Sequence, residues 1–584
     1  MPSGRHVAPL LFMLLSPGSP TLNVTFERDN SATWTNVLKG FYNDQSWTDA
    51  SGWDASIDFA YFPLRDAVVG RGAYDWSTTM DPALALAGAR ARHLVVRFYL
   101  DYPSKATGVP DYLVDAGLGF RNYTDLGGGA CPDYENETLV VALEGFVGAL
   151  GARYDNDARL GGVQAGLLGF WGEWHTWPHS EWFASAATQR RVLDAFARAF
   201  NATPVMVRYA DAVTAPYDVG FHDDSFAYST VGASIGWFFA SQLASAGATE
   251  RWRARPIGGE LRPELQATIF SDAYAQGAYA QNFSYAARAT KASALLNYRA
   301  FTPGYAGADL ARARDAARLL GYELVARWAS AETAYAGGAL VANLTVALAN
   351  EGIAPFYRPL RPRARGGGGG GGGGGDTALA CVAGCDGGRL ALHEALQPGA
   401  TVLLRGAVEL GAQDVDAHRG GLLSSVNITI DCGVCYQARP VALANAEAVG
   451  GVLPLPRRLF VSPATSAEPS AAPTTTPYPT AAPTTSAPTT SAAPTCQCGC
   501  CCSCNSNCCR NYEDDALEHM GEGILFFGLL IVIPLCCFCI ARFLCRLEDH
   551  GPLRSPPRKA QQDSATASTG GATAMRSTTQ GAVV

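Results

Sequence analysis

The hydrophobic pattern divides the chain into two regions of different periodicity. From Trp34 to about Tyr322, short apolar runs alternate with segments of helical spacing, and this alternation repeats eight times. Strands are expected at roughly 34–42, 56–65, 92–101, 165–173, 203–210, 217–223, 255–260 and 292–299. Strands that alternate with helices predict an α/β fold, a (β/α)8 TIM barrel over residues 21–321, with a long insertion after the third strand.

Beyond residue 322 the pattern favours antiparallel strands. The segments YELVARW and ALVANLTVALAN carry alternating apolar residues without helical spacing, which predicts an antiparallel β-sandwich domain over 322–461. Ten consecutive glycines at 366–375 cannot form a packed strand, so they predict a flexible loop between strands.

Both ends of the chain read as segments outside the folded domains. Residues 1–20 have the layout of a signal peptide, and 462–495 have the Pro/Thr/Ser composition of a mucin-like stalk. A cysteine-rich segment, 496–523, precedes a predicted transmembrane helix at 524–544 and a tail at 545–584. Acidic residues precede that helix and arginines follow it, which predicts a single-pass type I membrane protein with a cytoplasmic carboxyl end. The bulk would be extracellular or lumenal.

Sequons and charge support the same placement. Acceptor sites for N-glycosylation occur at Asn23, Asn122, Asn136, Asn201, Asn282, Asn343 and Asn427, all before the apolar segment. The 584 residues carry a net charge of −8, without the basic stripe that binds nucleic acid.

The 17 cysteines are unevenly distributed, and their bonding is open from the sequence. Cys381, Cys385, Cys432 and Cys435 allow two disulfides in any of three pairings, or a zinc site. Eight cysteines at 496–509 predict either a disulfide knot or a soft-metal site. Cys131 has no evident partner.

The segment GFWGEWHTWP, residues 169–178, presents Glu173 among aromatic side chains, namely Trp171, Trp174, His175 and Trp177. A carboxyl group in a partly desolvated aromatic pocket has a raised pKa, and aromatic faces stack on sugar rings, so this pattern is typical of sugar-cleaving sites. A second glutamate, Glu260, ends the predicted seventh strand in PIGGELRPE. Carboxylates ~5–5.5 Å apart would make a retaining glycosidase, and ~6.5–9.5 Å an inverting one. The alternative is that either glutamate only pairs with an arginine.

Polar residues gather at the expected carboxyl ends of other strands. In HLVVRFYLDYP one face is apolar. Arg97, Tyr99 and Asp101 lie on the other face, successively closer to the carboxyl end of the strand and so to the mouth of a barrel. Further candidates for substrate binding lie at similar ends, namely Arg65, Arg208, His222, Asp223 and Asn297. Interior ion pairs that only stabilise the barrel are the alternative interpretation.

Several of these motifs resemble known barrels. The arrangement is similar to the clan A retaining glycoside hydrolases, and GAYDWSTTMD resembles the link after strand two in beta-galactosidase-like members. The segments VLKGFYN, RFYLDYPSKATGVPDYL, GLLGFWGEWHTWP, VGFHDDSFAY and PIGGELRPE together resemble a barrel family, with an appended β-sandwich, that is described only as a domain of unknown function. The resemblance spans roughly 34–360 and implies Glu173 as acid/base and Glu260 as nucleophile. One departure is Gly172, where many clan members carry an asparagine that binds the sugar 2-hydroxyl.

The sequence therefore predicts a membrane-anchored hydrolase of O-glycosidic bonds in an extracellular or lumenal glycan. The mechanism would use two carboxylates and need no cofactor or metal. An inactive glycan-binding or adhesion protein on the same barrel is the second hypothesis, and a structural surface glycoprotein is the third. The sugar, the linkage and the oligomeric state cannot be derived from the chain.

Overall fold

The computed structural model describes residues 22–29, 34–232, 236–277, 279–336, 339–366, 375–410, 426–436, 441–449 and 452–455. The predicted signal peptide, stalk, cysteine-rich segment, transmembrane helix and tail lie outside these residues, as do residues 367–374 of the glycine run. Across the described ranges, no helix has both the length and the apolar character needed to span a membrane.

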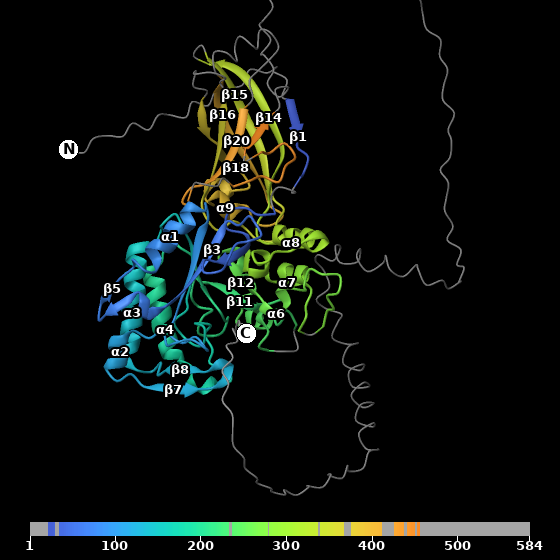
Figure 1. Ribbon diagram of the computed structural model, residues 1–584. Coiled ribbons are helices and arrows are strands. Elements are labelled where there is room, and N and C mark those ends of the chain that lie inside the picture. Colours follow the sequence, from blue (N-terminus) through green and yellow to red (C-terminus); the bar gives the residue numbers. More distant parts are fainter. Residues whose placement is uncertain are drawn as a thin grey trace, which may run out of the picture. The chain divides into compact units, whose positions relative to one another are not determined.

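Eight parallel strands form a closed barrel, as the alternating pattern predicts (Figure 1). Neighbours in the barrel are consecutive barrel strands in chain order, and the last strand pairs with the first through Leu295 opposite Phe41. The strands are β2 (Gly40–Asp44), β3 (Ile57–Pro63), β6 (His93–Tyr99), β9 (Leu160–Gln164), β10 (Val205–Val207), β11 (Gly220–Phe226), β12 (Ile257–Leu261) and β13 (Ala294–Leu296).

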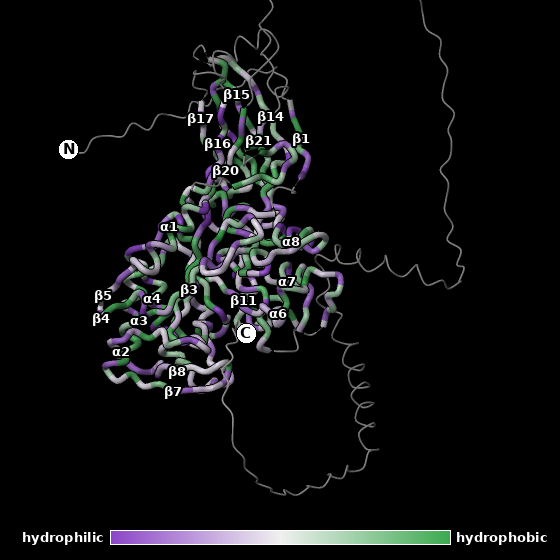
Figure 2. The backbone as a smooth tube through the Cα atoms, in the orientation of Figure 1, coloured by the Kyte–Doolittle hydropathy of each residue, from purple (hydrophilic) through white to green (hydrophobic). Residues whose placement is uncertain are grey.

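Helices cover the outside of the barrel, and hydrophobic and hydrophilic residues alternate along them (Figure 2). The longer ones are α1 (Met80–Ala89), α3 (Glu137–Tyr154), α4 (Ala186–Ala199), α5 (Phe239–Ser245), α7 (Phe283–Thr290) and α8 (Gly307–Leu319). In α4, Val192, Leu193 and Phe196 are buried, as three- and four-residue steps require. On β6, Val96 and Phe98 pack outward with the helices, whereas Val95 faces the barrel interior.

The fourth strand was predicted too late in the chain. The segment 165–173 forms a loop, and the strand is the preceding LGGVQ of β9, whose two glycines weaken its apolar signal. Left-handed backbone conformations, which interrupt regular strand geometry, occur in this loop at Leu167, Gly169, Trp171 and Gly172. Glu173 therefore lies on a turn nine residues beyond β9, not at the end of a strand.

The long insertion after the third barrel strand is present. It contains the short helix α2 (Asp111–Asp115) and the antiparallel pair β7 (Phe120–Tyr123) and β8 (Gly129–Pro132), followed by α3. Cys131 in β8 is buried and is not part of a disulfide, and burial is the main cause that raises its pKa to about 12.

Two antiparallel sheets form the predicted sandwich, and residues from both contribute to one core. One sheet contains β1 (Leu22–Thr25), β14 (Leu324–Ala336), β15 (Ala339–Asn350), β19 (Thr401–Leu410) and β18 (Ala380–Ala383). The other contains β17 (Asp376–Ala378), β16 (Leu360–Gly366), β20 (Val426–Cys432) and β21 (Val452–Leu455). The first strand, β1, comes from the amino-terminal side of the barrel sequence and places Leu22 opposite Ala331.

Four cysteines of the sandwich form two local disulfides. Cys381 bonds Cys385 and Cys432 bonds Cys435, which selects one of the three pairings that the sequence allows. In the described ranges, no group of three or more His, Cys, Asp or Glu side chains is placed to hold a metal ion.

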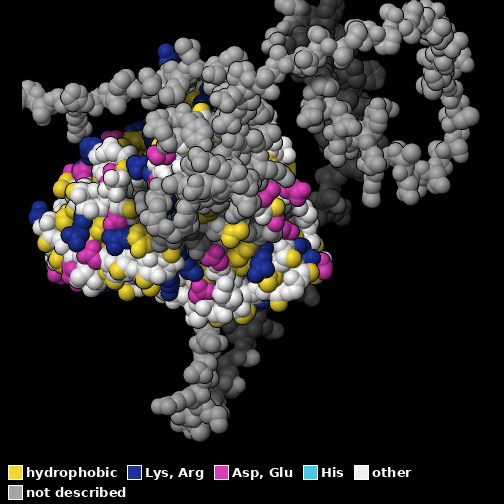
Figure 3. Space-filling view, turned by 90° about the horizontal axis from the view of Figure 1, so that it is seen from above, with side chains coloured by type: hydrophobic (Ala, Val, Ile, Leu, Met, Phe, Trp, Pro, Cys, Tyr) yellow, Lys and Arg dark blue, Asp and Glu magenta, His cyan; other side chains and the backbone are white. Residues whose placement is uncertain are grey.

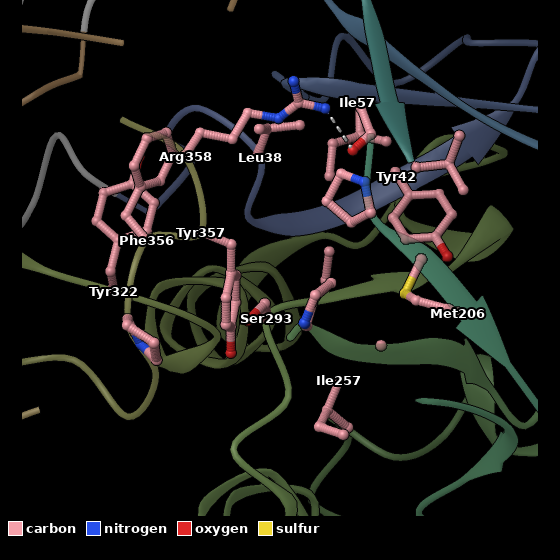
Figure 4. Close-up of a pocket in the computed structure, with 17 residues that line it drawn as sticks. Leu38, Tyr42, Ile57, Met206, Ile257, Ser293, Tyr322, Phe356, Tyr357 and Arg358 are labelled. Carbon is pink, nitrogen blue, oxygen red and sulfur yellow. Dashed lines mark hydrogen bonds between the residues drawn. The ribbon is translucent and has the colours of Figure 1, made fainter. Parts of the chain in front are cut away.

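The amino ends of the barrel strands are closed by the segment that leads into β16. A mainly apolar cavity of about 60 Å³ lies there, lined by side chains such as Met206, Phe356 and Tyr357 (Figure 4). Nη2 of Arg358 donates to the carbonyl of Leu160 at 2.7 Å, and the side chain is buried. This end of the barrel holds only a small apolar cavity, and active sites of such barrels lie at the carboxyl ends of the strands.

Candidate active site at the carboxyl ends of the barrel strands

The loop after β9 presents Glu173 through a tight turn. Left-handed backbone conformations occur at Gly169 (φ 82°), Trp171 (φ 54°), Gly172 (φ 65°) and Trp174 (φ 59°). The amide of Glu173 donates to the carbonyl of Phe170 at 2.8 Å, and the amide of Trp171 donates to the carbonyl of Asp101 at 2.9 Å. These bonds attach the turn to the end of β6, so the position of Glu173 depends on both segments.

The three tryptophans of this loop have different environments. Trp174 is buried, and its Nε1 donates to the carbonyl of Ala165, so its ring belongs to the protein core. Trp171 is half-buried beside His175, with ring centroids 5.9 Å apart. Trp177 is 63% exposed. Trp171 and Trp177 are therefore available to a ligand, whereas Trp174 supports the loop from below.

Glu173 lies beside two nitrogen-containing side chains. Its Oε1 is 3.4 Å from Nη1 of Arg97, and its Oε2 is 3.6 Å from Nε2 of His175. The carboxylate is 19% exposed, which leaves it accessible from solvent. Glu173 therefore pairs with an arginine, as the alternative interpretation of the sequence expected, and it also lies beside His175.

Arg97 connects three strands of the barrel. Its Nε donates to Oε1 of Gln164 at 2.7 Å, and its Nη2 donates to Oδ2 of Asp224 at 2.7 Å. The same Nη2 lies 3.3 Å from Nδ1 of His222. Since Gln164 ends β9 and the other two residues are on β11, one guanidinium ties β6, β9 and β11 together under Glu173.

Arg208 and Asp223 form a second buried pair. Nη2 of Arg208 lies 3.4 Å from Oδ1 of Asp223, whose Oδ2 accepts a hydrogen bond from Thr230 at 2.6 Å. The guanidinium of Arg208 also lies over the ring of Tyr209, 4.6 Å from its centroid. These contacts fix Asp223 in place and direct it away from solvent.

Burial and charge separate the pKa values on β11. Burial lowers the pKa of His222, and it raises the pKa of Asp223 despite the charge of Arg208. Burial also opposes ionisation of Asp224, but Arg97 and then His222 outweigh it and hold the pKa of Asp224 below its ordinary value. The carboxylate that balances Arg97 is therefore Asp224.

Glu260 ends the apolar part of β12 and differs from every other carboxylate of the site. Among the described residues, none forms a hydrogen bond or an ion pair with its half-buried side chain. Burial raises the pKa of Glu260 well above its ordinary value, and the charges of Asp224 and Glu173 add to the shift. An unpartnered carboxyl group that is electrostatically coupled to Glu173 is available to a ligand.

The sequence reasoning missed Tyr102, which lies near both glutamates. Burial raises the pKa of Tyr102 to about 12, and the charges of Glu260 and Glu173 contribute next. Nζ of Lys105 lies 3.7 Å from the centroid of the Tyr102 ring. Tyr102 directly follows the predicted third strand, and its position next to Asp101 was a usable signal. Gln164 and Tyr209 were missed as well, because β9 was placed too late and because only charged residues were sought after β10.

Other predicted residues lie at the edge of the site or beneath it. Tyr99 packs against Tyr61 and Tyr102, with ring centroids 5.0 and 5.3 Å apart. Asp101 is buried and accepts a hydrogen bond from Tyr123 at 2.8 Å, and burial raises its pKa to about 6. Its carboxylate belongs to the support of the loop and not to the open mouth.

Arg65 and Asn297 are engaged elsewhere. Nη2 of Arg65 pairs with Asp111 at 2.8 Å on the surface. Asn297 is buried, and its Nδ2 donates to the hydroxyl of Tyr305 at 3.3 Å. Neither side chain has a contact with Glu173 or Glu260 in the described part of the chain, so the place of the missing asparagine at Gly172 is not taken by Asn297.

The chain was compared with family profiles, with curated proteins and with solved structures. No family profile matches the chain, and no curated protein matches it. Solved structures with a similar barrel include endo-glycoceramidase II from Rhodococcus sp., 11% identical over 65% of this chain and 98% of that one, with a TM-score of 0.30. A GH5_18 variant from Bifidobacterium longum in complex with Manb1-4GlcNAc is 12% identical over 45% and 69%, with a TM-score of 0.29.

A third neighbour is the exo-beta-1,4-mannosidase of Opitutaceae bacterium strain TAV5, 13% identical over 50% of this chain and 52% of that one, with a TM-score of 0.27. These neighbours are clan A glycoside hydrolases, the group that the sequence motifs resemble. At such low TM-scores the assignment of the fold rests on the closed barrel itself, and the function rests on the site.

Proposed function

We propose that this protein is a glycoside hydrolase that binds a glycan at the carboxyl ends of its barrel strands and cleaves an O-glycosidic bond between Glu173 and Glu260. The observation that carries the proposal is the unpartnered, half-buried Glu260, whose raised pKa depends in part on the charge of Glu173. Two nearby carboxyl groups whose environments differ are the arrangement that glycosidic cleavage requires, since one must hold a proton and the other must not.

The surrounding residues supply the remaining functions. Arg97 and His175 contact Glu173, and the charges of both carboxylates contribute to the raised pKa of Tyr102. Trp171 and Trp177 present aromatic surface to a sugar. Arg208, His222 and Asp223 hold β10 and β11 in register beneath the mouth, together with Asp224. None of these steps calls for a metal or an organic cofactor.

The roles of the two glutamates follow from the resemblance, which makes Glu173 the acid/base and Glu260 the nucleophile of a retaining mechanism. A nucleophile has to be ionised, and the raised pKa of Glu260 opposes this in the free protein. The assignment therefore requires that the pKa of Glu260 falls when a glycan is bound. A 2-fluoro glycoside that traps a covalent intermediate tests it, because peptide mass spectrometry then locates the sugar ester at Glu260 or at Glu173.

Glycan binding without turnover is the second candidate, and two observations favour it. Gly172 offers no side chain to the sugar 2-hydroxyl, and a Cβ at this position would lie 3.1 Å from the carbonyl of Phe98. A protonated Glu260 can donate a hydrogen bond to a sugar, but it cannot attack an anomeric carbon.

Hydrolysis of a panel of aryl glycosides by the purified protein separates the two candidates. We expect Glu173→Gln and Glu260→Gln to lose activity, whereas Glu250→Gln, an exposed glutamate that pairs with Arg253, keeps the wild-type rate. Binding of glycans without turnover in the wild type would reject the hydrolase and retain the binding protein. Activity that survives both glutamine variants would reject the proposed carboxylate pair.

The proposed placement is that of a single-pass type I membrane protein with its folded domains outside the cytosol. Both disulfides of the sandwich belong to an oxidising compartment. The sequon asparagines are accessible: five are exposed, and Asn136 and Asn427 are half-buried. Removal of N-glycans from protein made in a secretory host should lower its mass, and an unchanged mass would contradict this placement.

A further inference from the structure

Three aromatic side chains outside the carboxylate pair form one surface, here named the aromatic platform: Tyr228, Trp237 and Tyr279. Trp237 is 52% exposed and Tyr279 is 42% exposed. Their ring planes differ by only 18°, with centroids 6.2 Å apart, and Tyr228 continues the surface with its centroid 5.1 Å from that of Tyr279. Exposed aromatic residues that stand singly are ordinary, whereas here three rings are in mutual contact and two of them are more than 40% exposed.

The platform lies on the same side of the barrel as the glutamates. Tyr228 and Trp237 follow the carboxyl end of β11, and Tyr279 follows the carboxyl end of β12, the strand that carries Glu260. Arg262 links the two places: its guanidinium lies 4.9 Å from the centroid of the Tyr228 ring, and its charge acts on the carboxyl group of Glu260. Arg262, two residues beyond Glu260, therefore lies between the proposed site and the platform.

Hydrogen bonds fix the loops that carry the platform. Oε1 of Gln281 accepts from the amides of Thr230 and Val231 at 3.1 and 3.0 Å, which joins the loop after β12 to the loop after β11. The hydroxyl of Thr230 donates to buried Asp223 at 2.6 Å. Phe238 packs beneath both rings, 4.8 Å from Trp237 and 5.9 Å from Tyr279. The two loops are thus joined to each other at Gln281 and to β11 at Asp223, and Phe238 packs against both exposed rings.

An exposed aromatic cluster beside polar side chains suits a ligand that is both apolar on its faces and polar on its edges. Sugar rings have this character, because axial C–H groups contact the negative face of an aromatic ring while hydroxyls stay in water. We propose that the aromatic platform binds a sugar ring of the glycan that is remote from the bond between Glu173 and Glu260. The ligand is then an oligosaccharide of several units and not a single terminal sugar. This inference rests on the proposed function of the carboxylate site.

Binding as a function of chain length tests the inference. Glu260→Gln serves as the background, and the probes are gluco-, galacto- and manno-oligosaccharides of one to six units, measured by calorimetry. For the series that binds, affinity should rise with length and then level off. In this background Trp237→Ala should weaken the longest ligand about three- to tenfold and reduce the ratio of dissociation constants between the shortest and longest ligands. Trp237→Phe should restore part of that ratio.

Tyr285→Ala is the matched control, because Tyr285 is 64% exposed on α7 and is not part of the platform. It should retain the length dependence of the background protein, and thermal melting should show that both alanine variants are folded. Equal length dependence in Trp237→Ala and Tyr285→Ala would overturn the inference while leaving the carboxylate pair intact. In another outcome, the wild type hydrolyses no glycan while Trp237→Ala still reduces the length dependence of binding. That result would support the platform and reject only the hydrolase.

Discussion

Nη2 of Arg97 lies 2.7 Å from Oδ2 of Asp224, and both side chains are almost completely buried. Removing one partner of a buried ion pair leaves an uncompensated charge in a medium of low polarity. The pair also connects β6 to β11 beneath Glu173, so its loss affects the fold and the site together.

We predict that Arg97→Met lowers the free energy of unfolding by about 3–5 kcal/mol, because Asp224 and His222 lose the guanidinium that they share. Urea unfolding measures the change. Arg153→Met is the control, since Arg153 forms an exposed pair with Asp81 that should contribute about 1 kcal/mol or less. If the two variants lose equal stability, the buried pair does not hold the barrel in the way described.

Glu260→Gln is expected to change the pH dependence of stability. In the unfolded chain a glutamate ionises at about pH 4.3, whereas burial raises the pKa of Glu260 in the folded protein. Between these two values the folded protein binds the extra proton, so the free energy of unfolding of the wild type falls as the pH rises. Glutamine has no proton to lose, and this decline should disappear in the variant.

The measurement is the stability of Glu260→Gln minus that of the wild type, followed from pH 4 to pH 9. The difference should increase with pH by about 1.4 kcal/mol for each unit by which the folded pKa exceeds the unfolded one. Glu250→Gln provides the baseline, because Glu250 is exposed. A difference that stays constant with pH would show that Glu260 has an ordinary pKa.

The sequence predicted the barrel well because its signal is repeated. Eight apolar runs separated by helical spacing admit few folds, and the prediction survived the misplacement of the fourth strand. The sequence proposes Glu173, Glu260 and Arg97 for the site because their charged side chains follow apolar runs, and the structure brings Arg97 against Glu173. Their roles stay predictions. The partners of Arg97 were harder to predict: Asp224 is one of several consecutive polar residues, and Gln164 lies just before the predicted fourth strand.

Residues of ambiguous character were predicted least well. A tryptophan packs in a core as readily as it binds a ligand, and only the structure shows that Trp174 is buried whereas Trp177 is exposed. The platform residues Trp237 and Tyr279 are 42 positions apart, and no local pattern indicates that their rings meet. On the face seen in Figure 3, Lys and Arg side chains are interspersed with Asp and Glu side chains.

Gly172→Ala should be destabilising and should disturb Glu173. Position 172 has a φ of 65°, and a Cβ there would lie 3.1 Å from the carbonyl of Phe98 and 3.3 Å from Cα of Gly166. The left-handed conformation alone costs about 1–2 kcal/mol for a residue with a side chain. Gly148→Ala in α3 is the matched control: a Cβ there meets no atom within 4 Å, so we expect about 0.5–1 kcal/mol of stabilisation. Equal effects of the two substitutions in thermal unfolding would contradict the described turn.

We predict the stability contribution of the two disulfides in the sandwich, and the same variants distinguish disulfides from a zinc site. Each closes a very short loop, since the paired cysteines are separated by 4 and by 3 positions. In the chain-entropy description such loops contribute about 2 kcal/mol apiece. Replacing Cys381 and Cys385 together by alanine should therefore lower the free energy of unfolding by about 2 kcal/mol, and the pair Cys432 and Cys435 by a similar amount.

Cysteines that hold zinc would behave differently toward a chelator. With disulfides, EDTA should leave the midpoint of thermal unfolding of the full chain unchanged, whereas dithiothreitol should lower it. The shift caused by dithiothreitol should be smaller when Cys432 and Cys435 are already alanine, because this disulfide is then no longer there to be reduced. The disulfide directly precedes Tyr436, whose amide donates to the carbonyl of Ala158 at 2.8 Å and links the sandwich to the barrel. A midpoint that falls with EDTA in the wild type but not in a variant lacking all four cysteines would instead establish a metal site.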